Sequence, residues 1–210
     1  FFPGCALSGT RPEQTRHVFE SLQQQIPNVG IVLDCCTKPS HDLGRQDYFS
    51  AMFGELKSYL LAQGIKQVLV ACPNCYQVFS EYGGVLETRT IYELLDAQGP
   101  ANDIPISGTV HVHDPCVTRF VGPVQQAVRS LIEKNGLQIS ETRHNRKTTL
   151  CCGEGGAVGC FSPELSKSWG VKWNKEVSTN RTLTYCAGCA NYLGQHAPTS
   201  HVLDLLYAPV

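Results

Sequence analysis

The sequence has little net charge and no long apolar run. Its 210 residues carry 17 Lys and Arg against 18 Asp and Glu, which leaves a formal net charge of −1. This balance gives no electrostatic basis for binding nucleic acid or an anionic membrane surface. No stretch approaches the roughly 18 consecutive apolar residues that a membrane-spanning helix needs. We therefore expect a globular protein with no nucleic-acid partner and no direct membrane span.

Two further signatures are missing. The glycine-rich stretch 153–159 does not fit the dinucleotide-binding pattern G-x-G-x-x-G, because Val158 occupies the last required position. No secretory signal peptide is visible, and the first residue is Phe1 in place of Met. We therefore expect the sequence to be a fragment, a processed form or one domain of a longer protein.

Cysteine, in contrast, is abundant, with 11 residues that fall in clusters. A secreted disulfide scaffold would be shorter and richer in loops. Adjacent cysteines rarely bridge to each other, but they can present two sulfurs to one metal cluster. The clusters favour metal or cluster ligation over catalytic thiol pairs and disulfides. Thiolate ligands of this kind imply a reducing compartment, so we expect a cytoplasmic location.

The cysteine pattern occurs twice in the same order. The first copy reads C-x29-C-C-x35-C-x2-C and the second reads C-x34-C-C-x33-C-x2-C. The tails align as well, since 91–95 (IYELL) matches 202–206 (VLDLL). Such self-similarity indicates a repeated structural unit. It predicts two pseudo-symmetric lobes, residues 1–105 and 106–210, whose cysteines are Cys5, Cys35, Cys36, Cys72 and Cys75 in the first and Cys116, Cys151, Cys152, Cys186 and Cys189 in the second.

Hydrophobic patterning predicts an α/β fold, with a small, mostly parallel sheet flanked by helices in each lobe. Strands are expected at the chain start and at 30–33, 67–71, 109–113 and 181–185. Helices are expected at 13–26, 45–63, from 73 onward, 90–97, 122–135, 163–177 and 200–206. Most cysteine groups directly follow a strand, and ligands gather at the carboxyl ends of parallel strands. Each lobe should therefore collect its five sulfurs at one edge.

Five thiolates per lobe exceed the four that one zinc ion or one cubane cluster needs. The excess suggests a larger or less symmetric iron–sulfur cluster, or one thiolate that binds and releases. The alternative is that four cysteines bind and the fifth packs as a small hydrophobe. Cys160 lies outside both copies and is expected to be a buried thiol.

These residues resemble the CCG (cysteine-rich) domain pair found in the cysteine-rich subunit of heterodisulfide reductases. Similar pairs occur in the iron–sulfur subunits of glycolate/lactate oxidase and of anaerobic glycerol-3-phosphate dehydrogenase. The resemblance rests on the ten repeated cysteines, on P-G-C at 3–5, on H-D-P-C at 113–116 and on C-C-G-E-G-G at 151–156. It implies one noncubane [4Fe–4S] cluster per lobe, held by the ten cysteines. The first motif departs from the pattern, because Thr37 follows Cys36 where the family has glycine, and zinc is therefore an alternative in the first lobe.

The resemblance favours an oxidoreductase component that reduces a disulfide and is active only with partner subunits. Its clusters would lie at a cleft shared by the two lobes. His113 and Glu154 are candidate catalytic proton donors there, with Lys38 and His41 along the same cleft. The C-x2-C-x2-C-x3-C-P ferredoxin run is missing from the sequence. Electrons must therefore arrive from ferredoxin-like iron–sulfur or flavoprotein subunits or domains, and any membrane association would depend on such a partner.

Two other functions stay open from the sequence. One is a non-catalytic electron-transfer subunit of a flavin-dependent 2-hydroxy-acid or glycerol-3-phosphate dehydrogenase. The other is a zinc-binding structural module. Iron and sulfide analysis separates the zinc module from the redox functions, and disulfide turnover separates the two redox functions.

Overall fold

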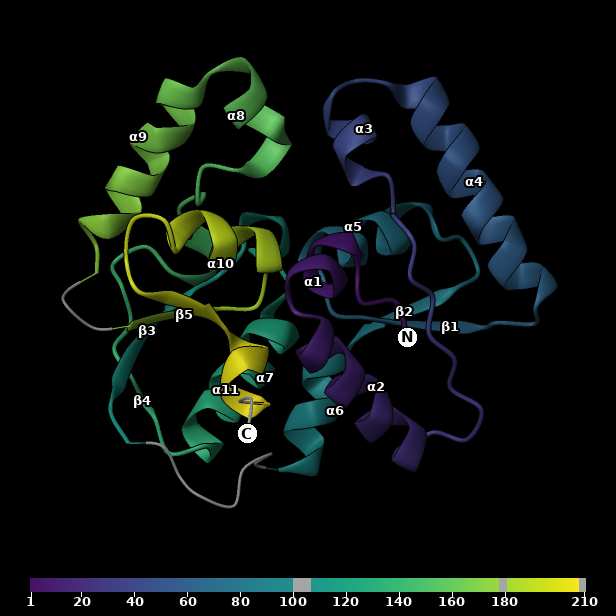
Figure 1. Cartoon of the computed structure of the whole chain (residues 1–210), viewed down its shortest axis with the longest axis horizontal. Helices are drawn as coiled ribbons and strands as arrows, with labels where there is room; N and C mark the ends of the chain where they lie inside the picture. Colours follow the sequence, from purple (N-terminus) through teal and green to yellow (C-terminus); the bar gives the residue numbers. More distant parts are fainter. Residues whose placement is uncertain (100–106, 178–180, 208–210) are drawn as a thin grey trace.

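The protein consists of two α/β lobes that lie side by side, in a computed structural model that describes residues 1–99, 107–177 and 181–207 (Figure 1). In the first lobe, β1 (Gln67–Val70) pairs in parallel with β2 (Glu87–Thr90). In the second, a parallel sheet has the order β4-β3-β5-β6, from β3 (Thr109–His113), β4 (Gln138–Ile139), β5 (Arg181–Thr184) and β6 (Thr199–His201). The predicted α/β fold is confirmed. The predicted boundary at 105/106 lies outside the described residues.

Helices flank both sheets. The first lobe contains α1 (Cys5–Thr10), α2 (Pro12–Gln25), α3 (Lys38–Asp42), α4 (Gln46–Ala62), α5 (Pro73–Tyr82) and α6 (Ile91–Gln98). The second contains α7 (Gly122–Lys134), α8 (Val158–Phe161), α9 (Pro163–Asn174), α10 (Ala187–Leu193) and α11 (Val202–Leu206), with 3-10 turns η1 (Cys116–Thr118), η2 (Arg146–Thr148) and η3 (Gly155–Ala157). Proline stands in the first turn of α2, α5, α7 and α9, where its missing N–H has no intrahelical acceptor to lose.

The strand predicted at 30–33 is wrong. Its backbone pairs only with the chain start, where the Phe1 amino group donates to Gly30 O at 2.6 Å and Val32 N donates to Phe1 O at 2.9 Å. Phe2 in turn forms an isolated parallel bridge with Val70 of β1. The pairing is too short for a ladder, and Leu33 is 68% exposed. The β-branched residues at 31 and 32 predicted a buried strand, but this segment lies at the edge of the lobe and is only partly buried.

The largest hydrophobic core is shared between the lobes. It combines side chains from α2 and α6 of the first lobe, such as Leu22 and Ile91, with Val128 and Ile132 of α7 and residues of α11 from the second. Helices α6 and α7 lie in direct contact across the border. Smaller cores lie within the single lobes, around Phe49 to Phe79 in the first and around Trp173 in the second. The lobes are therefore joined through their interiors, not only through surface contacts.

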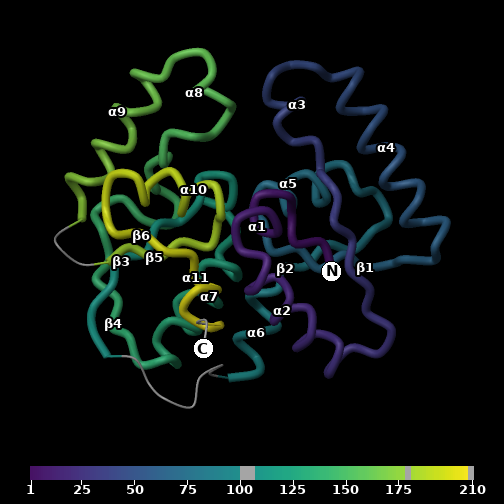
Figure 2. The backbone as a smooth tube through the Cα atoms, in the orientation of Figure 1, coloured from purple at the N-terminus to yellow at the C-terminus, as the bar shows by residue number. Residues whose placement is uncertain are grey.

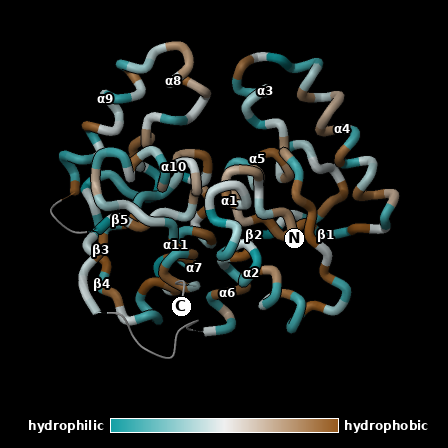
Figure 3. Tube along the Cα trace, viewed as in Figure 1, coloured by the Kyte–Doolittle hydropathy of each residue, from teal (hydrophilic) through white to brown (hydrophobic). Residues whose placement is uncertain are grey.

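A pair of helices stands at the same end of each lobe. In the backbone trace, α3 with α4 and α8 with α9 rise beyond the sheets on the two sides of the molecule (Figure 2). Both pairs follow the adjacent cysteines, at 35–36 and at 151–152. Along α4, both hydrophilic and hydrophobic residues occur (Figure 3). In the described ranges, no helix combines the length and the apolar character needed to cross a bilayer.

Candidate metal centres

The five cysteines of the first lobe come together from three chain segments. Cys5 begins α1, Cys72 caps α5, and Cys75 lies in the first turn of α5. The Sγ atoms of Cys5 and Cys35 are 4.0 Å apart, and those of Cys75 and Cys36 are 3.3 Å apart. Gly4 allows this approach, because a Cβ atom there would lie 2.8 Å from Cys72 Cβ. The predicted gathering of sulfurs is thus present in this lobe, although Cys35 and Cys36 follow the irregular segment 30–33 and not a strand.

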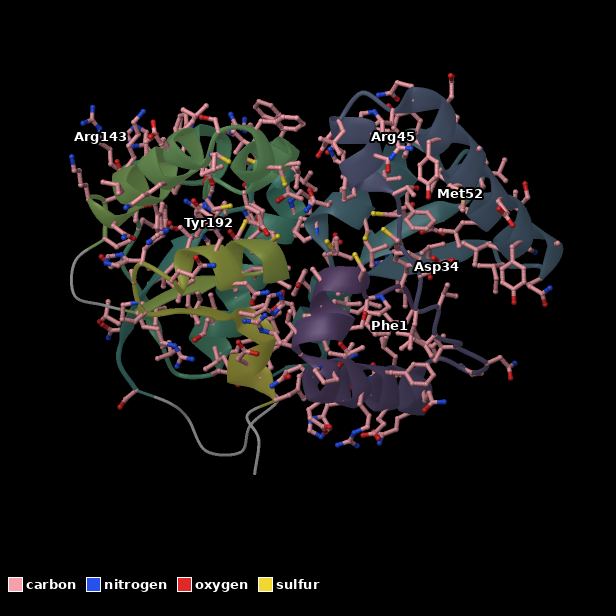
Figure 4. All side chains as sticks on the ribbon, turned by 45° about the horizontal axis from the view of Figure 1, so that its top comes forward. Phe1, Asp34, Arg45, Met52, Arg143 and Tyr192 are labelled. Atoms are coloured by element: carbon pink, nitrogen blue, oxygen red, sulfur yellow. The ribbon has the colours of Figure 1, made fainter. Side chains whose placement is uncertain are left out.

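The second lobe repeats the arrangement. Cys116 begins η1, Cys186 caps α10, and Cys189 lies in the first turn of α10. The Cys151 thiol is in hydrogen-bonding contact with Cys116 and Cys152, and Cys152 is also in contact with Cys189. All 11 cysteines are free thiols. In the view with all side chains, sulfur atoms lie on both sides of the border between the lobes (Figure 4).

Backbone N–H groups point at the sulfurs in both lobes. Thr37 N donates to Cys35 Sγ at 3.4 Å, and Gly153 N donates to Cys151 Sγ at 3.3 Å. In the second lobe, Glu154 N also reaches Cys152 Sγ at 3.5 Å. Such donors stabilise thiolates and tune the electron density of a metal ligand. The residue after each cysteine pair therefore contributes its backbone, whatever its side chain is.

The thiols in each group polarise one another. Hydrogen bonding from Cys35 lowers the pKa of Cys5 to about 7, and hydrogen bonding from Cys75 lowers the pKa of Cys72 to about 7. The pKa of Cys35 is raised in return, first by its hydrogen bond to Cys5. In the second lobe, the pKa of Cys151 is lowered, with Cys116 as the main cause. Each group thus favours some thiolates but cannot ionise fully without a cation to offset the charge.

The donor set fits an iron–sulfur cluster by its chemistry. In the part of the chain that the structure describes, no three His, Cys, Asp or Glu side chains are grouped as ligands of a single metal ion. The sulfurs are held as neighbouring pairs, and five soft donors exceed the four of a structural zinc site. Thiolates of this kind select zinc, copper(I) or iron–sulfur clusters. The ligand roles of the ten cysteines stay a prediction.

The elements that carry the two cysteine groups touch across the border between the lobes. Helix α1, which begins at Cys5, contacts α10, which carries Cys189. Helix α5, which carries Cys75, contacts η1, which begins at Cys116. The segments that follow the two cysteine pairs, α3 and η3, are also in contact. The elements that introduce the two groups are thus adjacent, while the facing of the sulfurs and the cleft between them stay predictions.

His113 lies inside the second lobe and not on its surface. Its side chain is fully buried, with Nε2 3.2 Å from Leu150 O, Nδ1 3.3 Å from Thr184 Oγ1 and its ring against Trp173. Burial lowers the pKa of His113 to about 4, although the nearby Asp114 carboxylate opposes this shift. The imidazole is therefore neutral at pH 7 and holds the peptide just ahead of Cys151 in place.

Glu154 occupies a different environment. It is exposed, yet its carboxyl group lies so close to Gly188 that a Cβ atom there would come within 2.3 Å of Oε2. Desolvation raises the pKa of Glu154, and the charge of Cys151 adds to the shift. In the first lobe, Lys38 pairs with Asp42, and His41 Nε2 lies 3.0 Å from Tyr82 Oη. Glu154 is thus the predicted proton donor that has both access and a cysteine nearby.

A buried ion pair behind the second cysteine group went unrecognised in the sequence. Asp114 is fully buried and accepts two hydrogen bonds from Arg129, at 2.9 and 2.8 Å, and one from Arg146 N at 2.7 Å. The Asp114 carbonyl also accepts from Thr149 Oγ1 at 2.7 Å. These bonds tie the segment before Cys116 to the segment before Cys151. Asp114 stands in the H-D-P-C motif, but nothing along α7 distinguished Arg129 as its partner.

The expectation for Cys160 is wrong, because this cysteine is exposed. It lies in α8, a short helix on which no apolar face is buried. Its neighbour Phe161 is 74% exposed as well. The apolar neighbours of Cys160 in the sequence suggested burial, but the helix stands out from the lobe.

The fold and the two cysteine groups define a protein with two cysteine-rich α/β lobes. The sequence matches the family model of the cysteine-rich domain, CCG, over residues 1–80 and 110–194. The chain therefore belongs to the CCG cysteine-rich domain family, and the resemblance seen in its motifs is confirmed.

The chain is similar to three curated oxidoreductase proteins. It is 25% identical to a subunit of the fumarate reductase (CoM/CoB) of Methanothermobacter marburgensis, over 90% of the chain and 40% of that protein. It is 26% identical to a subunit of the dihydromethanophenazine:CoB–CoM heterodisulfide reductase of Methanosarcina barkeri, over 64% of the chain and 36% of that protein. It is 22% identical to the probable iron-sulfur-binding oxidoreductase FadF of Bacillus subtilis, over 86% of the chain and 28% of that protein. The matches thus span less than half the length of each relative.

Proposed function

We propose that this chain is the cysteine-rich part of an iron–sulfur oxidoreductase of the heterodisulfide-reductase type. In this proposal it receives electrons from a ferredoxin-like iron–sulfur or flavoprotein subunit or domain and passes them to a disulfide. One observation carries the proposal: each lobe has five free thiols of the repeat, and elements that carry them touch at the border between the lobes. The names of the relatives, two of them subunits of CoM/CoB reductases, support the same class.

The chain's own residues would hold and tune the metal centres. The ten repeated cysteines are the proposed ligands, with noncubane [4Fe–4S] clusters as the favoured cofactor in both lobes. Clusters bound there would supply one-electron acceptance and donation. The backbone N–H groups of Thr37, Gly153 and Glu154 stabilise the thiolates. Buried Cys36, Cys75, Cys152 and Cys189 keep part of each group away from water.

A disulfide needs two electrons and protons, and the proposed facing arrangement suits this requirement. Two one-electron centres within reach of one substrate avoid leaving a thiyl radical. Glu154, exposed beside Cys152, is placed to hold a proton at its carboxyl group for a product thiolate. Because His113 is fully buried, the proposal gives it the role of positioning Leu150 instead of the predicted proton delivery.

A second function, electron relay without catalysis, is favoured by one observation. The burial of His113 removes one of the two predicted proton donors from any substrate site. The chain would then be an electron-transfer part of a flavin-dependent dehydrogenase. Because Thr37 stands where the family pattern has glycine, zinc remains an alternative to a cluster in the first lobe. That lobe would then have a structural role.

Metal analysis and turnover together test these functions. The protein, purified anaerobically with its natural partner subunits, is analysed for iron, acid-labile sulfide and zinc, and then assayed with a disulfide and an artificial electron donor. Iron, sulfide and disulfide turnover support the reductase. Iron and sulfide without turnover support the relay, and zinc without sulfide in both lobes overturns both. Cys152→Ser is expected to remove the signal of the second lobe's cluster, while the matched Cys160→Ser leaves it unchanged.

A further inference from the structure

A single tyrosine hydroxyl joins the two cysteine groups. Tyr92 Oη lies 2.9 Å from Ala71 O and 3.0 Å from Tyr185 O. Ala71 directly precedes Cys72, and Tyr185 directly precedes Cys186. The hydroxyl thus lies between the backbones that introduce the C-x2-C motifs of the two lobes, and both distances are in the range of good hydrogen bonds.

Packing alone does not require a hydroxyl group at position 92. Tyr92 is 1% exposed, and the equivalent position in the second lobe, Leu203, is 0% exposed. A leucine therefore fills this place in one half of the repeat without any polar group. Burying a hydroxyl is unfavourable unless it is hydrogen-bonded, and Tyr92 meets this condition by sharing its one proton between a carbonyl oxygen of each lobe in a three-centre hydrogen bond.

The surroundings keep the hydroxyl protonated. Burial raises the pKa of Tyr92 well above its ordinary value, and charges on Cys72 and Cys186 raise it further. One thiol from each lobe therefore acts on the same phenol. The ring is held by an edge contact with the Tyr185 ring, with centroids 5.6 Å apart. The bridge is thus a fixed donor and not a group that exchanges its proton.

We propose that Tyr92 is a positioning residue that couples the two cysteine groups electronically through its hydroxyl. The path runs from Cys72 through the Ala71 carbonyl, the Tyr92 hydroxyl and the Tyr185 carbonyl to Cys186. Electronic coupling decays less steeply through bonds and hydrogen bonds than through empty contacts. With a cluster bound in each lobe, one electron would pass from one to the other along this path, with no bond broken and no proton moved.

This inference rests on the proposed function and deepens it. If a disulfide takes two electrons at facing centres, an electron that enters at one lobe has to reach the other. The Tyr92 bridge gives the chain a route within its own core, closed to water. The same route serves the relay function, so the inference does not depend on which of the two redox functions holds.

The test compares Tyr92→Phe with Tyr185→Phe in the complete protein with its partner subunits. Both variants lose one buried hydroxyl of the same ring pair. Among the residues that the structure describes, the Tyr185 hydroxyl bonds to Thr118 and Asp114 of its own lobe, and its carbonyl is unchanged by the substitution. Tyr185→Phe therefore controls for the loss of a buried hydroxyl without touching the bridge.

The readouts are iron and sulfide content, the magnetic interaction between the two centres by electron paramagnetic resonance, and the rate of interlobe electron transfer after rapid reduction. We expect Tyr92→Phe to keep its metal, to weaken the magnetic interaction and to slow the transfer severalfold, while Tyr185→Phe leaves both at the wild-type level. A variant with 4-aminophenylalanine at position 92, which keeps a para donor, should restore the coupling and replaces Tyr92→Phe if that variant does not fold.

The outcomes separate the inference from the proposed function. A wild type with metal in both lobes, in which Tyr92→Phe leaves the coupling unchanged or Tyr185→Phe lowers it equally, overturns the inference alone. Loss of coupling in the folded aminophenylalanine variant also overturns it. A wild type with a cluster in only one lobe overturns the inference but not the redox assignment. A wild type without iron overturns both.

Discussion

Thr37 and Gly153 follow the two cysteine pairs and offer the same N–H to a sulfur, but their surroundings differ. Thr37 has φ 56° and Gly153 has φ 111°. A Cβ atom at Gly153 would lie 2.4 Å from Ser166 O, whereas the first lobe accommodates the threonine side chain. The glycine of the second lobe is therefore required by backbone and packing, whereas the first lobe holds Thr37 at the corresponding position with its backbone in the left-handed region.

Gly153→Ala should consequently destabilise the protein by about 3 kcal/mol, through strain at positive φ and the clash with Ser166. The matched change, Thr37→Gly, removes strain but raises the conformational entropy of the unfolded chain. Its free energy of unfolding should therefore stay within about 1 kcal/mol of the wild-type value. Denaturant unfolding measures both. Equal effects of the two changes would contradict the close contact described for Gly153.

The buried side chain of His201 should make the stability of the fold depend on pH. Burial and, to a lesser extent, the Arg11 charge together lower the pKa of His201 to about 3, although the Asp204 carboxylate opposes the shift. The unfolded chain takes up a proton below the ordinary histidine pKa of 6.5 while the folded chain does not, so stability is complete above that pH and falls as the pH drops toward 3. The slope for one such group is about 1.4 kcal/mol per pH unit.

His201→Asn tests this linkage. Asparagine retains a cap acceptor for the N–H of Leu203, which Nδ1 of His201 accepts at 3.2 Å, but it does not titrate. Denaturant unfolding between pH 5.5 and pH 4, inside the window set by the two pKa values, should show a shallower loss of stability for the variant than for wild type, by about 1.4 kcal/mol per pH unit. An unchanged slope would show that His201 takes up its proton in the folded state.

At the scale of elements, Arg129 of α7 connects the helix layer to the second cysteine group. Removing one partner of a buried ion pair leaves an uncompensated charge. Asp114→Asn should therefore destabilise the protein by about 3 kcal/mol, since the Arg129 side chain is only 4% exposed. Arg16→Ala, at an exposed pair with Glu13 and Glu20, should change stability by less than about 1 kcal/mol. If both variants unfold alike, the ion pair does not hold the two cysteine segments.

The sequence predicted most elements because their patterns are local. Runs such as 109–113 and 122–135 carry their own periodicity, and the structure has β3 and α7 there. The short α3 and α8 bury none of their residues, and β2 (ETRT) carries mostly polar residues, so a pattern of buried apolar positions could not find them. The repeat located the cysteine groups. It could not reveal the burial of His113, because that depends on Trp173, 60 positions away in sequence.

At the scale of the molecule, the shared core binds the two repeats into one folding unit. Predicted fragments 1–105 and 106–210 would each expose the face that α6 and α7 cover for each other. We expect neither fragment alone to give a cooperative unfolding transition, while a mixture of both regains native circular dichroism. Sharp, independent transitions of the separate fragments would show that the lobes are autonomous domains despite the shared core.

The same shared interior links metal supply to the lifetime of the polypeptide. Because ligation is coupled to folding, a lobe that lacks its metal opens more often. Opening either lobe uncovers apolar side chains of the other, since both contribute to one core. Proteases cleave the open form, so shortage of iron would shorten the half-life of the whole chain and not of one half. Cells limited for iron would thus clear this protein instead of accumulating a half-assembled form.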